Sequence, residues 1–257
     1  MVDIREIIGL VKETRALLFD TRAAEAVTVK GRADFVTEVD LKIQAFLKNE
    51  LHARYPGIQF MGEEQDNSGL DPSRAVWILD PVDGTTNLIR HYNQSAVSLG
   101  LYENGAGLLG VVYQPFTGEV FHAVKDGGAF LNGAPIHVSG TRTMRDSLVA
   151  IGTNPYRKET AAENFPVFQR VFEGCQDIRR SGSAALDLAH VACGRLDAYF
   201  EQNLKPWDYA AGAVILTEAG GRVTDYRGGT LSVRHNSDLA ASNGRIHPEL
   251  LACIHSA

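Results

Sequence analysis

A buried strand that ends in two aspartates is the feature that most limits how this chain can fold. The apolar run Trp77-Ile78-Leu79 leads directly into Asp80-Pro81-Val82-Asp83-Gly84-Thr85-Thr86-Asn87. Pro81 fixes the backbone between the two carboxylates. Carboxylates side by side at the mouth of a strand repel each other, and their pKa values are pushed apart unless a cation lies between them. The segment therefore favours a site for a hard divalent ion such as Mg²⁺, which proteins hold through a few carboxylates plus substrate phosphate.

The residues after the second aspartate suit a phosphate. Thr85 and Thr86 can cap a following helix, and a helix N-terminus presents backbone N–H groups to an anion. A lone D-x-x-D-G segment is more often a turn rich in aspartate and glycine between two strands. The metal-site hypothesis therefore depends on carboxylates elsewhere in the chain.

Further carboxylates lie at the ends of predicted elements. They are Glu63 and Glu64 after a short strand at 58–61, Asp208 at the start of a helix that ends at Gly220-Gly221, and Asp40, three residues after Thr37. Thr37 and Asp40 have the spacing of an N-terminal capping arrangement. Each segment is ordinary by itself, but together they offer the carboxylates that a multi-metal phosphoryl-transfer site uses.

The composition excludes several other classes of protein. The 257 residues are 44% hydrophobic and 22% charged, which is typical of a globular protein with one substantial core or two modest ones. A net charge of −6 gives no basic footprint for DNA or RNA. The three cysteines contain no C-x-x-C pair, which argues against a disulfide framework or a zinc site. With no signal peptide and no apolar run of roughly 18 residues, we expect a cytoplasmic protein without a membrane segment.

The first half of the chain predicts two helices packed on an antiparallel sheet. One amphipathic helix covers Ile4 to Leu18, and a second begins near Thr37 and continues to Leu51. Short strands separated by turn residues follow at 96–101, 108–113, 119–123 and 129–131. The segment 105–110 fits G-x-G-x-x-G, but it precedes a strand instead of opening a helix, so we interpret it as a hairpin turn.

The second half alternates between strands and helices. Strands are expected at 148–151, 198–200, 222–224 and 239–241, and helices at 162–172, at 183–193, from Trp207 and from Pro248. No linker, repeat or low-complexity tract separates the halves. We therefore expect an N-terminal half at 1–138 and a C-terminal half at 139–257 that share a broad interface.

Taken in order, these motifs resemble the inositol monophosphatase family, the Mg²⁺-dependent, lithium-sensitive phosphatases that include relatives of fructose-1,6-bisphosphatase. The resemblance runs from Gly62-Glu63-Glu64 through 80–87 to Trp207-Asp208 and 218–221. It implies an α+β fold, a layered αβαβα sandwich with the site where the halves meet. One departure is Leu88-Ile89-Arg90, where the family usually has an aromatic residue and then a histidine.

The resemblance also implies a set of metal ligands. One Mg²⁺ would be held by Glu63, Asp80 and the backbone carbonyl of Val82. Asp80 would bridge to a second ion that is held also by Asp83 and Asp208, which keeps two ions close enough to clamp one phosphate. The family uses two or three such ions.

Catalytic and substrate residues follow in the same way. The catalytic residues would be Glu63, Thr85, which orients the attacking water, and Asp40, which accepts through the threonine hydroxyl. The substrate would be bound by Gly84, Thr85, Gly182, Ser183, Ala184, Glu201 and Asp208. The Gly84 and Thr85 amides would bind phosphate, and Glu201 would accept hydrogen bonds from substrate hydroxyls.

The resulting prediction is hydrolysis of a phosphate monoester by a metal-activated water, with inositol-1-phosphate or a related sugar phosphate as substrate, in a homodimer. Histidinol phosphatase, fructose-1,6-bisphosphatase and 3′-phosphoadenosine 5′-phosphate phosphatase are alternatives, and the last is disfavoured because it commonly has lysine where this chain has Thr86. A regulatory interaction protein, acting for example on the transcription machinery, is a further alternative. The complete ligand set argues against it. We expect no nucleic acid and no membrane as partners.

Overall fold

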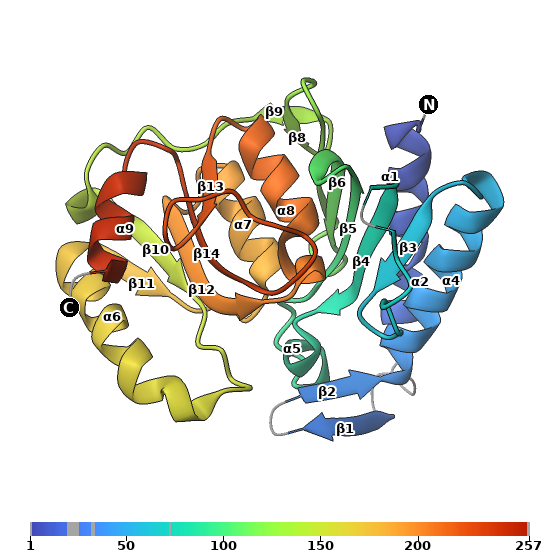
Figure 1. Ribbon diagram of the computed structural model, residues 1–257, viewed down its shortest axis with the longest axis horizontal. Helices are drawn as coiled ribbons and strands as arrows, with labels where there is room; N and C mark the ends of the chain where they lie inside the picture. Colours follow the sequence, from blue (N-terminus) through green and yellow to red (C-terminus); the bar gives the residue numbers. More distant parts are fainter. Residues whose placement is uncertain (1, 20–25, 32–33, 72, 256–257) are drawn as a thin grey trace.

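The chain folds into five alternating layers of helices and sheets (Figure 1). The computed structural model describes residues 2–19, 26–31, 34–71 and 73–255. A seven-stranded sheet and a five-stranded sheet each carry helices on their outer face, and two helices lie between the sheets. The predicted αβαβα sandwich is therefore confirmed.

The seven-stranded sheet contains the meander that the sequence predicts. Its strands, in spatial order, are β3 Gln59–Gly62, β4 Val76–Asp83, β5 Ala96–Glu103, β6 Ala106–Gln114, β7 Glu119–Val124, β8 Ala129–Leu131 and β9 Ala134–Ile136. All neighbours are antiparallel except β3 and β4, which are parallel. Strand β9 was not predicted from the sequence.

The outer face of this sheet is covered by the N-terminal helices. These are α1 Ile4–Glu13, α2 Arg15–Leu18 and α4 Glu38–Arg54, the last preceded by a hairpin of β1 Val27–Gly31 and β2 Asp34–Thr37. The prediction of one continuous helix from Ile4 to Leu18 is wrong. The chain breaks at Thr14, whose hydroxyl donates a 2.6 Å hydrogen bond back to the Val11 carbonyl and competes with the helical ladder.

The five-stranded sheet is mixed and lies in the second half of the chain. Its order is β11 Asp177–Arg179, β10 Leu148–Ile151, β12 Ala198–Leu204, β14 Ser237–Ser242 and β13 Arg222–Asp225. Its outer face packs on α6 Ala161–Gly174 and α9 His247–His255. Because all strands of the larger sheet precede residue 138 and all strands of this sheet follow it, we propose the division into 1–138 and 139–257 as two structural halves.

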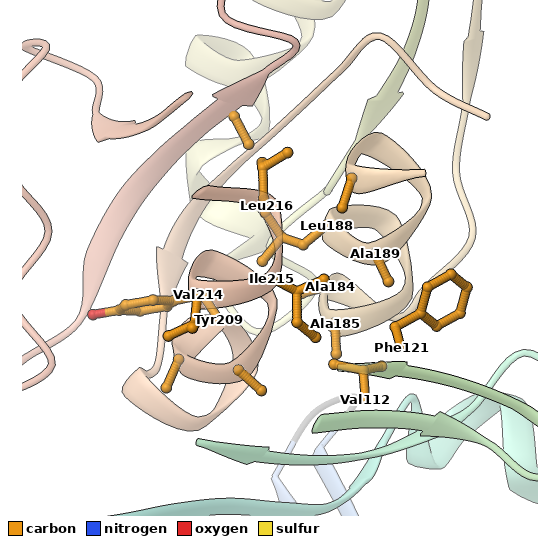
Figure 2. Close-up of a cluster of buried hydrophobic side chains, with 14 of the residues drawn as sticks. Val112, Phe121, Ala184, Ala185, Leu188, Ala189, Tyr209, Val214, Ile215 and Leu216 are labelled. Atoms are coloured by element: carbon orange, nitrogen blue, oxygen red, sulfur yellow. The ribbon is translucent and has the colours of Figure 1, made fainter. Parts of the chain in front are cut away.

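The middle layer consists of α7 Ala184–Ala192 and α8 Pro206–Glu218, and it forms the largest apolar core (Figure 2). Val112 and Phe121 of the larger sheet face this layer, as Figure 2 shows. The approach of α8 to the sheet is close, because a Cβ atom at Gly110 would lie 2.4 Å from the carbonyl oxygen of Ala211. Both sheets are thus fixed against the two helices whose first turns border the site.

Candidate active site

One cavity of about 230 Å³ collects nearly all the residues that the sequence analysis selected. The predicted residues that line it are Glu63, Asp80, Val82, Asp83, Gly84, Thr85, Gly182, Ser183, Ala184, Glu201 and Asp208. Asp40 does not line the cavity and reaches it only through Thr85. The cavity is therefore formed by both halves of the chain, at the end of β4 and at the first turns of α7 and α8.

Strand β4 presents Asp80 and Asp83 to the cavity. As predicted, the strand ends in the two aspartates: it continues to Asp83, with a shift of register against β5 between Asp80 and Asp83. Pro81 has no N–H to donate to the ladder, so an irregularity at this point is expected. The Val82 N–H donates to Asp80 Oδ1 at 3.0 Å, which orients the first carboxylate.

Asp83 connects the two halves of the chain. Its Oδ2 atom accepts hydrogen bonds from Ser183 Oγ at 2.5 Å and from the Ala185 N–H at 2.7 Å. Ser183 is the N-cap of α7, so Asp83 receives a hydroxyl and a backbone donor from one helix terminus. Burial raises the pKa of Asp83 to about 6, although these two hydrogen bonds lower it.

The raised pKa values of Asp80 and Asp208 show that negative charge is unfavourable in this cavity when no cation neutralises it. Burial raises the pKa of Asp80 well above its usual value, and the carboxylates of Glu63 and Asp83 raise it further. The pKa of Asp208 is raised by the same two causes, burial first and then nearby carboxylates. Asp208 lies in the first turn of α8, where its Oδ2 accepts the Lys205 N–H at 2.7 Å.

A chain of hydrogen bonds runs from the cavity to the start of α4. Asp40 Oδ2 accepts the Thr37 N–H at 2.9 Å and the Thr37 hydroxyl at 2.5 Å, which confirms the predicted capping arrangement. The Thr85 hydroxyl lies 3.2 Å from Asp40 Oδ1 and 3.0 Å from the Val82 carbonyl oxygen. Since a hydroxyl has one proton, these two acceptors are alternatives. Burial raises the pKa of Asp40 to about 6.

In the turn after Asp83, the prediction that a threonine caps the following helix is wrong. The helix that follows, α5 Thr85–Ile89, is capped by Gly84, so neither Thr85 nor Thr86 is its N-cap. Gly84 has a φ of 91°, and a Cβ atom there would lie 2.8 Å from the Gln94 carbonyl oxygen. Only glycine fits both the left-handed backbone and the space. The Thr85 side chain is consequently free to face Asp40.

Three of the cavity residues that were not predicted from the sequence carry polar side chains with contacts across the site. Asp187 of α7 lines the cavity and accepts the Ser181 hydroxyl at 2.7 Å. Arg180 contributes the positive charge on this side, with a 3.3 Å contact to the Thr153 hydroxyl. Asn87 fastens the turn to the second half, because its amide donates to the Ser181 carbonyl at 3.0 Å. An aspartate inside a helical pattern, or an asparagine after a turn, gives no sequence signal for these contacts.

The donor set suits a hard divalent cation. It consists of carboxylate oxygens and one backbone carbonyl, which are the ligands that Mg²⁺ and similar ions take. Within the described residues, no three carboxylate, histidine or cysteine side chains already converge as a ready-made metal centre. Asp80, Asp83 and Asp208 each accept a backbone N–H, which orients their carboxyl groups. The residues fit the ion by chemistry and by their common cavity.

Among the helices in the described ranges, none is long and apolar enough to cross a membrane.

Comparisons with known proteins extend over nearly the whole chain. The model of the inositol monophosphatase family matches residues 4–257. An inositol-1-monophosphatase of Synechocystis sp. is 42% identical over 227 residues, 88% of this chain and 79% of that protein. The Nus factor SuhB of Escherichia coli is 37% identical over 238 residues, 91% of this chain and 87% of that protein. The crystal structure of the extragenic suppressor protein suhB from Bartonella henselae matches with a TM-score of 0.90 at 34% identity, covering 98% of this chain and 97% of that one.

Proposed function

Because this chain belongs to the inositol monophosphatase family, we propose that it is a Mg²⁺-dependent phosphatase that hydrolyses a phosphate monoester of a small polyol or sugar. The observation that supports this most directly is the shared cavity of Glu63, Asp80, Asp83 and Asp208. These carboxylates come from three separate segments. Burial raises the pKa values of the three aspartates, and neighbouring carboxylates raise them further. Such an arrangement is favourable only when a cation neutralises it.

The proposed metal ligands are those that the sequence resemblance implies. Glu63, Asp80 and the Val82 carbonyl would hold one ion, and Asp80, Asp83 and Asp208 a second. When bound, Mg²⁺ supplies charge neutralisation at the phosphoryl group and makes water a stronger nucleophile. The chain's own residues then bind and orient the reactants.

Thr85 and Asp40 are proposed to position the attacking water. When the Thr85 hydroxyl donates to Asp40 Oδ1, its lone pairs are directed to accept a hydrogen bond from water in the cavity. Ionised Asp40 is the stronger acceptor of this hydrogen bond, and at 1% exposure its carboxyl group is shielded from bulk water. For the phosphate, the N–H groups of Gly84 and Thr85 lie at the N-cap and the first residue of α5, where N–H groups lack an intrahelical acceptor.

The far side of the cavity favours hydroxyl groups over a second phosphate. Glu201 and Asp187 both line it, and each can accept hydrogen bonds from a polyol. A second phosphate there would face two carboxylates, with Arg180 as the one cation among the lining residues of the described chain. We therefore favour a monophosphate such as inositol-1-phosphate over fructose-1,6-bisphosphate.

Asp83→Asn tests the proposal. The change keeps an oxygen that can accept from Ser183, so the fold is expected to persist, while Mg²⁺-dependent release of phosphate from myo-inositol-1-phosphate is lost. Asp66→Asn is the matched control, because Asp66 is exposed and accepts hydrogen bonds from Ser68. Full activity of the Asp83 variant, or wild-type activity that EDTA does not change, would sink the assignment.

A second candidate is a mainly regulatory interaction protein, which similarity to the Nus factor SuhB of Escherichia coli supports. The same variant separates the two functions. A phosphatase loses its function with Asp83→Asn, whereas an interaction role survives if the variant folds. The cavity carboxylates favour the phosphatase.

A further inference from the structure

Gly152 lies directly beneath the carboxyl group of Glu201. It follows the last residue of β10, and it lines the cavity together with Glu201. A Cβ atom on Gly152 would lie 1.8 Å from Cδ and 1.9 Å from Oε2 of Glu201. The two groups cannot occupy this space together, so the absence of a side chain at position 152 is what admits the carboxyl group.

The backbone of Gly152 cannot move away to relieve such a contact. Its N–H donates to the Phe200 carbonyl at 2.9 Å, which extends the parallel pairing of Ile151 with Phe200. Phe200 is 1% exposed and packs in the outer core of the five-stranded sheet. If a side chain is added at position 152, the group that moves is therefore the end of the Glu201 side chain, which is flexible.

Two donors hold the Glu201 carboxyl group in its present place. The Tyr199 hydroxyl donates to Oε2 at 2.7 Å, and the Asn154 N–H lies 3.2 Å from Oε1. Tyr199 is fully buried, so its hydroxyl has little freedom to follow a displaced carboxyl group. A side chain at position 152 consequently removes Glu201 from both donors and from its place in the cavity wall.

We propose that Gly152 is a positioning residue that sets the location of Glu201 and thereby the preference of the enzyme for phosphate monoesters with hydroxyl groups. This inference rests on the proposed phosphatase function. Gly152 itself offers no group to the substrate. It acts by leaving the space in which Glu201, oriented by Tyr199, can accept hydrogen bonds from a polyol.

The test compares kcat/KM for myo-inositol-1-phosphate with kcat/KM for p-nitrophenyl phosphate, which has no hydroxyl groups. Gly152→Ala should lower the ratio of the two values by about 10- to 100-fold, the effect of losing one hydrogen bond to a charged group. The values for p-nitrophenyl phosphate should stay near those of the wild type. Gly140→Ala is the matched control, because a Cβ atom there meets no atom of the described residues within 4 Å.

A double-mutant cycle distinguishes positioning from a general structural role. If Gly152 acts through Glu201, Gly152→Ala adds nothing to the loss caused by Glu201→Ala. Additive losses, or equal losses on both substrates together with a lower melting temperature, would overturn the proposal.

Tyr199→Phe provides an independent variant should Gly152→Ala fail to fold. It removes the donor to Oε2 and keeps the ring, so the same ratio should fall, and an unchanged ratio would contradict the inference. A wild-type protein that hydrolyses neither substrate would overturn the proposed function itself. Wild-type activity with an unchanged ratio in Gly152→Ala would overturn the positioning role alone.

Discussion

Replacing Asp40 with asparagine is expected to stabilise the metal-free protein at alkaline pH while impairing catalysis. Asp40 is 1% exposed, and burial raises its pKa from 3.8 to about 6. Between these values the folded protein binds more protons than the unfolded chain, so the free energy of unfolding falls as the pH rises through this window. One pKa unit corresponds to about 1.4 kcal/mol, so the ionised carboxyl group costs about 3 kcal/mol above the window.

An asparagine keeps an oxygen that can accept the Thr37 N–H, and it removes the charge. The variant should therefore gain up to about 3 kcal/mol at pH values well above 6 and almost nothing near pH 4, where folded wild-type Asp40 is protonated. Urea denaturation in EDTA at both pH values measures the gain. Phosphatase assays with Mg²⁺ should show a lower kcat, because the amide oxygen that accepts the Thr37 N–H leaves the NH₂ group, which is only a donor, facing the Thr85 hydroxyl.

Asp3→Asn is the matched control, since Asp3 also caps a helix but is exposed. The Arg5 N–H lowers the pKa of Asp3, so its replacement should change stability in the opposite direction above that pKa. Equal gains for Asp40→Asn at both pH values would refute the reasoning, because the benefit would then be independent of ionisation.

Two further predictions concern packing and lithium. Gly110→Ala should lower stability by about 1–3 kcal/mol in calorimetry, because the added methyl group collides with the Ala211 carbonyl. Gly9→Ala meets no neighbour and should not destabilise, so equal losses in the two variants would disprove a packing origin. LiCl should inhibit phosphate release uncompetitively at fixed Mg²⁺, since the three aspartates proposed for the second ion are present. Equal rates in LiCl and NaCl would show that these ligands alone do not confer inhibition.

The sequence motifs, together with the family resemblance that they carry, were sufficient to predict the layers and many of the cavity residues. Strand β4, the turn at 84–87 and the first turn of α8 each carry their polar residues within one short segment, so their spacing is visible in the sequence. The capping of α4 by Asp40 is local for the same reason. The error at Thr85 is instructive, because the capping propensity of threonine was outweighed by the left-handed backbone that Gly84 alone can supply.

The contacts that could not be predicted join distant segments. Ser183 donates a hydrogen bond to Asp83, which is 100 residues away in the sequence, and no local sequence pattern predicts this pairing. The space that Gly152 leaves for Glu201 depends on the register of β10 against β12. Asp187 sits inside an apolar helical stretch, where its spacing indicates no more than a polar face. These contacts depend on tertiary packing, so they can be identified only once the positions of the two sheets are known.

The layered arrangement has a consequence for synthesis on the ribosome. The strands of the seven-stranded sheet are complete by residue 136, but the helices that cover its inner face begin at Ala184 and Pro206. A nascent chain of intermediate length therefore holds Val112 and Phe121 on a face that its own later residues have yet to shield, a condition that exposes apolar surface to aggregation. In such a nascent chain, Asp83 also lacks its two hydrogen-bond donors, Ser183 and Ala185, at the start of α7. The emergence of α7 thus supplies the donors of that carboxylate, and α7 together with α8 covers that face.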